Sequence, residues 1–111
     1  MREVSLDEIK RLPWEFEYAQ NQTYEMCVEA VKRQGVLLKD VRWDELNLTK
    51  EQVYNLYLIA VRQDGFALKY VKLNKLSKDQ LDEICREALR QNRQAIEFIE
   101  NKDKYLEELN I

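Results

Sequence analysis

Three basic side chains occupy one position of a short motif that the chain contains three times. The copies read AVKRQG, AVRQDG and ALRQNR, and they lie 30 and then 28 residues apart. The third position of each copy holds Lys32, Arg62 and Arg90. If the copies pack next to one another, these cations form a ladder that can bind phosphates or an acidic partner. Their alternative role is structural, because cations in the last turn of a helix stabilise the helix dipole.

A second group of basic residues lies between the second and third copies. Lys69 and Lys72 begin a run of lysines at three-residue spacing, which continues with Lys75 and Lys78. We expect Lys69 and Lys72 to belong to the partner-binding surface. Acidic residues are interspersed with these cations and the net charge is −3. Nucleic acid is therefore less favoured as a partner than another protein.

Aromatic side chains form the other candidate surface. Most aromatic residues at helical spacing pack into a core, but exposed Tyr and Trp side chains anchor protein interfaces. We expect Trp43, Tyr54 and Phe66 to face the solvent, because loops between helical hairpins emerge on one edge of a stack. These three residues therefore join the candidate binding residues.

The residue types argue against catalysis. The chain contains no histidine, the commonest general base near neutral pH and the commonest metal ligand. It has neither a glycine-rich phosphate-binding loop nor a CxxC pair. We therefore expect no enzyme activity, no cofactor and no metal. Cys27 and Cys85 hold equivalent positions of the first and third copies, so the second copy would keep them too far apart for a disulfide.

Composition indicates one folded domain. The chain has 111 residues, of which 45% are hydrophobic and 35% are charged, as in folded domains rather than disordered segments. No stretch approaches the ~20 apolar residues of a membrane-spanning helix, and the first residues, MREVSLDEIKR, lack the apolar core of a signal peptide. We expect no membrane partner and a cytoplasmic location, in a bacterium or an infected host cell. The initial Met fits a complete gene product.

Local signals predict a helix in each copy. Thr23, Thr49 and Ser77 precede amphipathic segments and are good N-cap residues. Gln52 and Gln80 follow the last two caps by three residues, which is the capping-box pattern.

Glycines mark the predicted ends of the first two of these helices. Gly35 and Gly65 are expected to turn left-handed there, as glycine commonly does after a helix. The third copy has Arg93 instead, so we expect its turn to shift by one position to Asn92.

A shorter apolar pattern after each copy predicts the second helix of a hairpin. It covers residues 38–41, 68–71 and 96–99, with an earlier version at 16–19. Upstream, SLDEIKRLPWE reads as a degenerate helix that begins after Ser5 and ends at Pro13, and KDKYLEEL reads as a closing helix. The expected fold is all-α: about three and a half stacked short helical hairpins in one α-solenoid-like domain, residues 1–111. Its parts are a half repeat (1–22), repeats at about 23–48, 49–76 and 77–100, and a C-terminal cap (101–111).

The copies resemble a known family. EMCVEAVKRQGVLLKDV and VYNLYLIAVRQDGFALKYV are similar to the helical repeats of the domain-of-unknown-function family 4116, and the likeness extends over residues 16–99. Those repeats occur in tandem, chiefly in bacteria, phages and large viruses. The resemblance implies a helical-repeat fold and carries no activity and no functional residues.

Architecture gives the functional expectation. Helical solenoids usually bind other macromolecules through equivalent positions of several repeats. We expect a non-catalytic recognition module that binds a protein, for instance a small phage or mobile-element inhibitor of a host protein. Two alternatives stay open: a structural protein that self-assembles through its end hairpins, and nucleic-acid binding through the Lys/Arg ladder. The sequence leaves the oligomeric state undetermined.

Overall fold

α-helices alternate with 3₁₀ helices along the chain in the computed structural model, which describes residues 2–109. The α-helices are α1 (Leu6–Arg11), α2 (Tyr24–Arg33), α3 (Lys50–Gln63), α4 (Lys78–Gln91) and α5 (Lys102–Leu109). The 3₁₀ helices are η1 (Pro13–Tyr18), η2 (Gly35–Asp40), η3 (Trp43–Glu45), η4 (Gly65–Tyr70), η5 (Leu73–Lys75) and η6 (Arg93–Phe98). The described residues contain no β-strand, and one isolated bridge pairs Arg2 with Ala19.

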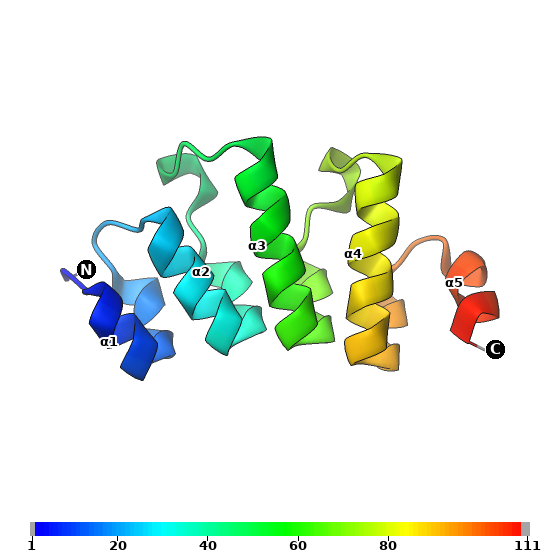
Figure 1. The fold of residues 1–111 in the computed structure, drawn as a ribbon, viewed down its shortest axis with the longest axis horizontal. Coiled ribbons are helices and arrows are strands. Elements are labelled where there is room, and N and C mark those ends of the chain that lie inside the picture. Colours follow the sequence, from blue (N-terminus) through cyan, green and yellow to red (C-terminus); the bar gives the residue numbers. More distant parts are fainter. Residues whose placement is uncertain (1, 110–111) are drawn as a thin grey trace.

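The elements pack in chain order. Figure 1 shows α1 to α4 side by side, with the 3₁₀ helices behind them and the two termini at opposite ends. Each α-helix from α1 to α4 contacts the next, and the longer 3₁₀ helices contact one another in the same order. The molecule is accordingly elongated, with extents of 47 × 25 × 17 Å. The prediction of an all-helical domain with packed helices is confirmed.

The predicted helix starts are confirmed by their caps. The side chains of Ser5 and Thr23 accept hydrogen bonds from main-chain N–H groups in the first turns of α1 and α2. Thr49 and Ser77 form complete capping boxes with Gln52 and Gln80 at the start of α3 and α4. These interactions are local, which explains why the sequence reveals them. Pro13 follows α1 and opens η1, where proline suits a first helical position.

The second helix of each hairpin is a 3₁₀ helix. In η1 and its C-cap the buried residues are Pro13, Phe16 and Ala19, three residues apart. The same spacing buries the equivalent residues of η2 and η4, which are Gly35, Leu38 and Val41, and Gly65, Leu68 and Val71. Side chains three residues apart eclipse one another on a 3₁₀ helix. Leu37 and Ala67 are buried as well, so the buried face of η2 and η4 is wider than this one column.

The prediction for the glycines is wrong in its mechanism. No residue between 2 and 109 has a positive φ, and α2 and α3 end in extended residues before Gly35 and Gly65 open the next 3₁₀ helices. Glycine is needed at both positions because a main-chain carbonyl of the next α-helix leaves no room for a Cβ atom. An ideal Cβ on Gly35 would lie under 3.0 Å from the carbonyl oxygen of Ala60, and one on Gly65 equally close to that of Ala88.

The expected left-handed turn at Asn92 is also wrong. Asn92 is extended, with φ −155°, and its side chain accepts a hydrogen bond from Gln94 N at 2.9 Å. Arg93 stands at the position of Gly35 and Gly65 and is exposed. The exposed position leaves room for this side chain, and α5 rather than another copy comes next in the described part of the chain.

The recurring glutamine of the motif links each copy to the one before it. Gln63 Oε1 accepts a hydrogen bond from Gly35 N, and Gln91 Oε1 accepts one from Gly65 N, both at 2.5 Å. In the first copy the same position holds Arg33, whose Nε donates to the Lys10 carbonyl at 3.0 Å. The motif therefore recurs because each copy uses it to hold its predecessor.

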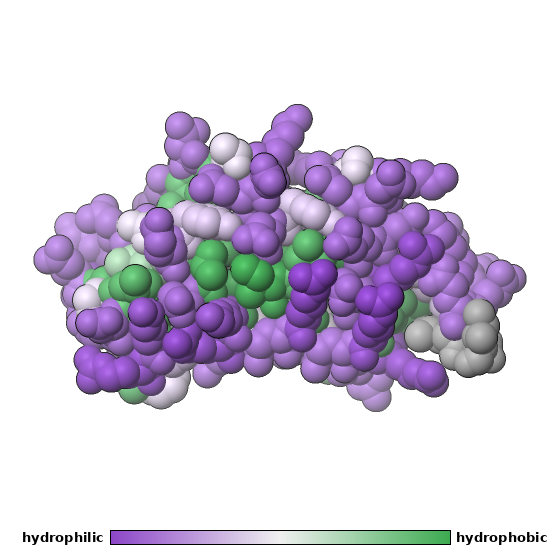
Figure 2. Space-filling model, viewed as in Figure 1, coloured by the Kyte–Doolittle hydropathy of each residue, from purple (hydrophilic) through white to green (hydrophobic). Residues whose placement is uncertain are grey.

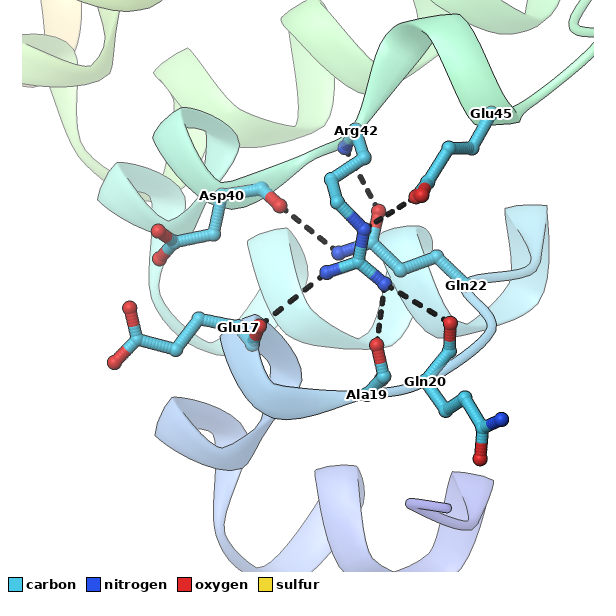
Figure 3. A network of polar contacts seen from close by, with 7 residues as sticks. All are labelled: Glu17, Ala19, Gln20, Gln22, Asp40, Arg42 and Glu45. Atoms are coloured by element: carbon cyan, nitrogen blue, oxygen red, sulfur yellow. Dashed lines mark hydrogen bonds and ion pairs between the residues drawn. The ribbon is translucent and has the colours of Figure 1, made fainter. Parts of the chain in front are cut away.

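The Arg42 side chain binds the end of η1 and so holds the segment after η2 against it (Figure 3). Its guanidinium donates to the carbonyls of Glu17 at 3.3 Å, Ala19, and Gln20 at 3.5 Å, and it pairs with Glu45. The main-chain N–H of Arg42 donates to Gln22 Oε1 at 2.8 Å, and the Gln22 amide donates to the Asp40 carbonyl at 2.9 Å. This network satisfies carbonyls at the end of η1 that have few partners within the helix.

Both cysteines are buried and free, as the spacing of the copies predicted. Burial in apolar surroundings raises the pKa of the Cys27 thiol to about 12 and also raises that of Cys85. Each thiol is thus a small core side chain in its protonated form.

Replacement of Gly65 by alanine tests the close approach. We expect Gly65→Ala to lower the free energy of unfolding by about 1–3 kcal/mol, because its Cβ forces the Ala88 carbonyl away. The matched control is Arg93→Ala, which should change it by less than about 0.5 kcal/mol. Urea denaturation followed by circular dichroism measures both. Equal effects of the two changes would contradict the explanation.

The Arg42 network gives a second test. Arg42→Ala should destabilise the fold by about 1–3 kcal/mol, since it removes charge-assisted hydrogen bonds to several carbonyls. Lys72 is the equivalent residue of the next connection and is exposed, so Lys72→Ala is the control and should be near neutral. Thermal denaturation of the two variants would refute the role of Arg42 if their midpoints coincided.

Candidate functional site

The ladder cations are exposed near the C-terminal ends of α2, α3 and α4. Two of them lie beside carboxylates of α4. Arg62 Nη2 is 3.6 Å from Glu87 and 3.8 Å from Glu83, and Arg90 Nη1 is 2.8 Å from Glu87. The surface around the ladder is therefore one of mixed charge, which holds phosphates less strongly than isolated cations would.

The three aromatic residues expected at the surface are each half-buried. Trp43 packs edge-to-face on Tyr57, with ring centroids 5.5 Å apart, and Phe66 packs likewise on Phe98 at 6.0 Å. Such contacts add to the stability of the core beyond the area they bury. Trp43 and Phe66 therefore join neighbouring elements of the fold.

Tyr54 belongs to a set of polar contacts between successive α-helices. Burial and the neighbouring carboxylate Glu83 of α4 raise the pKa of Tyr54 to about 12. At the equivalent position of α2, the Tyr24 hydroxyl accepts a hydrogen bond from Asn55 Nδ2 of α3 at 2.7 Å. In α4 that position is Asp82, which binds α5. Tyr54 thus contacts the next helix.

Two exposed aromatic residues escaped the sequence analysis. Trp14 and Tyr18 of η1 are 50% and 51% exposed, and Leu12 beside them is 38% exposed. Tyr18 occupies the position of Phe98, which packs on Phe66 of the preceding copy. Among residues 2–109, neither aromatic pair includes Tyr18. Alignment of the copies does not reveal this exposure, because it sets Tyr18 at the position of the half-buried Phe98.

Hydrophobic side chains also reach the surface of the α layer. Figure 2 shows them in the middle of this face, over α2 and α3, with hydrophilic residues around them. Val28 of α2 and Ile59 of α3 are half-buried and pack against the core. The equivalent residues of α4 are Arg86 and Glu87. This apolar surface therefore ends before α4.

The lysine run lies on the connection between η4 and α4. Lys69, Lys72, Lys75 and Lys78 are all exposed, and the Lys69 ammonium lies 5.8 Å from the centre of the Tyr70 ring. Among residues 2–109, the ion pairs within 4.0 Å include none of these four lysines. These four lysines, like Lys32 of the ladder, thus have no ion-pair partner in the described residues.

The described part of the chain offers no metal centre and no membrane span. No group of three or more His, Cys, Asp or Glu side chains within residues 2–109 is arranged to bind a metal ion. None of the helices between these residues combines the length and the hydrophobicity that crossing a bilayer requires.

Asp82 holds α5 against α4. Its Oδ1 accepts hydrogen bonds from Lys104 Nζ at 2.7 Å and from the Tyr105 hydroxyl at 2.6 Å. Lys104 and then Tyr105 lower the pKa of Asp82 below its ordinary value. Arg86 adds a two-pronged pair with Glu108, at 3.0 and 3.1 Å, and lowers the pKa of that carboxyl.

These lowered pKa values predict a pH dependence of stability. A carboxyl group whose pKa is lower in the folded state stabilises the fold above its unfolded pKa of about 3.9, and loses that contribution as the pH falls through its folded pKa. Asp82→Asn should cost about 1–2 kcal/mol at pH 7 and should reduce the loss of stability between pH 5 and pH 2.5. Asp44→Asn, at an exposed position, is the control. Identical pH profiles of wild type and Asp82→Asn in urea denaturation would exclude this role.

Comparison with known proteins concerns the second half of the chain. The model of a domain of unknown function (DUF4116) matches residues 54–103, which extend from α3 through η4, α4 and η6 to the start of α5. Neither the curated proteins nor the solved structures gave a match. The resemblance expected from the sequence is confirmed over residues 54–103, which are similar to the family of unknown function DUF4116.

Proposed function

We propose that the chain is a non-catalytic recognition module that binds another protein, and that its hairpins form a small α-solenoid of about three and a half units. The observation that carries this proposal is the exposure of Trp14 and Tyr18 on η1. Half-exposed Trp and Tyr side chains offer a large apolar area at low entropic cost, and such residues dominate the binding energy of protein interfaces. Leu12 enlarges the same surface.

The period of η1 divides its side chains into three columns. Pro13, Phe16 and Ala19 face the core, so the remaining positions point elsewhere. Trp14 shares one outer column with the exposed Glu17, and Tyr18 shares another with Glu15. The Arg2 guanidinium pairs with Glu15 at 2.7 Å. Each aromatic residue thus stands beside a carboxylate, an arrangement that repels phosphates and suits a protein partner.

Capture of a partner with matched variants tests the proposal. Immobilised wild type, Trp14→Ala/Tyr18→Ala, Leu106→Ala and Lys32→Glu/Arg62→Glu/Arg90→Glu are incubated with nuclease-treated lysate of the source organism. Leu106 is the control because it is 40% exposed at the other end of the molecule. We expect a defined protein on the wild type and on the Leu106 variant, and its loss from the aromatic variant.

Three other outcomes would overturn this proposal. Loss of the protein only from the ladder variant would move the site to Lys32, Arg62 and Arg90. Nucleic acid captured without nuclease and released by salt would favour the basic-surface function, because phosphate binding weakens steeply with ionic strength. Concentration-dependent sedimentation of the purified chain, with no captured protein, would indicate self-assembly.

A further inference from the structure

A cavity of about 310 Å³ lies where η5, α4 and α5 meet. This volume is at the lower end of the range of ligand sites, about 300–1,000 Å³. Its apolar lining consists of Leu73, Leu81, Cys85, Ile99 and part of Tyr105. The polar residues that line it are Asn74, Lys78, Asp82, Glu100, Asn101 and Lys104.

The cavity exists because two side chains are smaller here than in the preceding copy. There, Trp43 of η3 packs on Tyr57 of α3 with ring centroids 5.5 Å apart. The equivalent residues here are Leu73 of η5 and Cys85 of α4, and both line the cavity. Two aromatic rings have thus been replaced by an isobutyl group and a thiol. The cavity lies at the position of these smaller side chains, where Cys85 and Tyr105 are themselves buried.

The charges around the cavity also differ from those of the preceding copy. In that copy Arg42 pairs with Glu45 and binds carbonyls of η1. The equivalent residues here are Lys72 and Lys75, which are exposed and form no ion pair within residues 2–109. Lys78 lines the cavity itself. Arg42 is held by a carboxylate and by main-chain carbonyls, whereas these lysines form no ion pair among the described residues.

The carboxylates nearby offset only part of this positive charge, because the three unpaired lysines outnumber the two unpaired carboxylates. Asp82 is engaged by Lys104 and Tyr105. Asp79 and Glu100 are exposed, and neither lies in an ion pair within the described residues. Asp79 is in the first turn of α4, where its charge compensates the helix dipole.

We propose that this cavity binds one large apolar side chain of an acidic segment of a partner protein, with Lys72, Lys75 and Lys78 contacting the carboxylates that flank that side chain. The site is separate from the aromatic surface of η1. It rests on the proposed function only in that its occupant is a protein segment. The apolar lining selects the side chain, and the three lysines select an acidic neighbourhood.

Titration of the ¹⁵N-labelled chain with the peptide acetyl-Asp-Glu-Phe-Asp-Glu-amide tests this site by NMR. We expect saturable shifts of the amides of Leu73, Leu81 and Ile99. Replacement of Phe by Ala in the peptide should abolish them, and a peptide with Lys in place of its acids should not bind. The peptide measures the cavity alone, so its result does not depend on capture of a partner from lysate.

Two variants locate the interaction. Leu73→Trp restores the ring of the preceding copy and should abolish binding by filling the cavity. Lys72→Glu/Lys75→Glu should weaken it about tenfold through lost ion pairs. The control is Lys50→Glu, since Lys50 opens α3 as Lys78 opens α4. Circular dichroism confirms that each variant is folded.

Defined results would overturn the proposal. Peptide binding that survives in folded Leu73→Trp would place the peptide outside the cavity. Equal binding of the Phe and Ala peptides would exclude an apolar anchor, and equal weakening by Lys50→Glu would reduce the effect to net charge. Saturable binding of decanoate at these amides, without binding of the peptide, would make this a site for small amphiphiles. Absence of any shift up to the solubility of the peptide would exclude the site.

Discussion

Contact between Gly35 and the carbonyl oxygen of Ala60, repeated between Gly65 and Ala88, is the constraint on which the rest of the structure depends. It lets the start of each 3₁₀ helix touch the α-helix of the next copy. The same approach brings Gln63 and Gln91 within hydrogen-bonding distance of the glycine N–H groups. The facing residues Ala60 and Ala88 are fully buried.

The ends of the molecule follow from where this contact stops. Arg93 replaces the glycine in the third copy, and α5 covers α4 through Asp82 and Tyr105 instead of through a further copy. At the other end Trp14 and Tyr18 of η1 are exposed, and Asp40 stands in η2 where the partner ring of Trp14 would be, since Phe98 fills that position opposite Phe66. Both surfaces that we propose for binding thus lie where the regular packing is interrupted or where its side chains become smaller.

Local chemistry made the helix starts and the closing helix predictable from the sequence. Caps such as Thr49 with Gln52 depend on neighbours along the chain, and the structure confirms them. The role of Gly35 was not predictable, because glycine serves both where φ is positive and where a Cβ would collide, and only the position of Ala60 distinguishes the two. The apolar residues at 38–41 predicted a second helix there, but its 3₁₀ form was not predicted, since the buried neighbours Leu37 and Leu38 obscure a period of three.

The candidate site was predicted in part, since side-chain exposure depends on neighbours that the sequence does not place. Phe66 packs on a ring 32 positions further along the chain, and Arg62 lies next to carboxylates of the following helix. The cavity could have been predicted from the sequence. Alignment of the copies shows that the smaller Leu73 and Cys85 occupy the positions of Trp43 and Tyr57.

Amide hydrogen exchange of Gly35 and Gly65, measured by NMR, tests the central contact most directly. If each glycine packs against the next copy and donates its N–H to a glutamine, both amides exchange only when the copies separate or the domain unfolds. Their protection should then match that of core amides such as Val61. Exchange of either amide as fast as that of the exposed Asn74 would contradict the close packing of successive copies on which this account of the molecule rests.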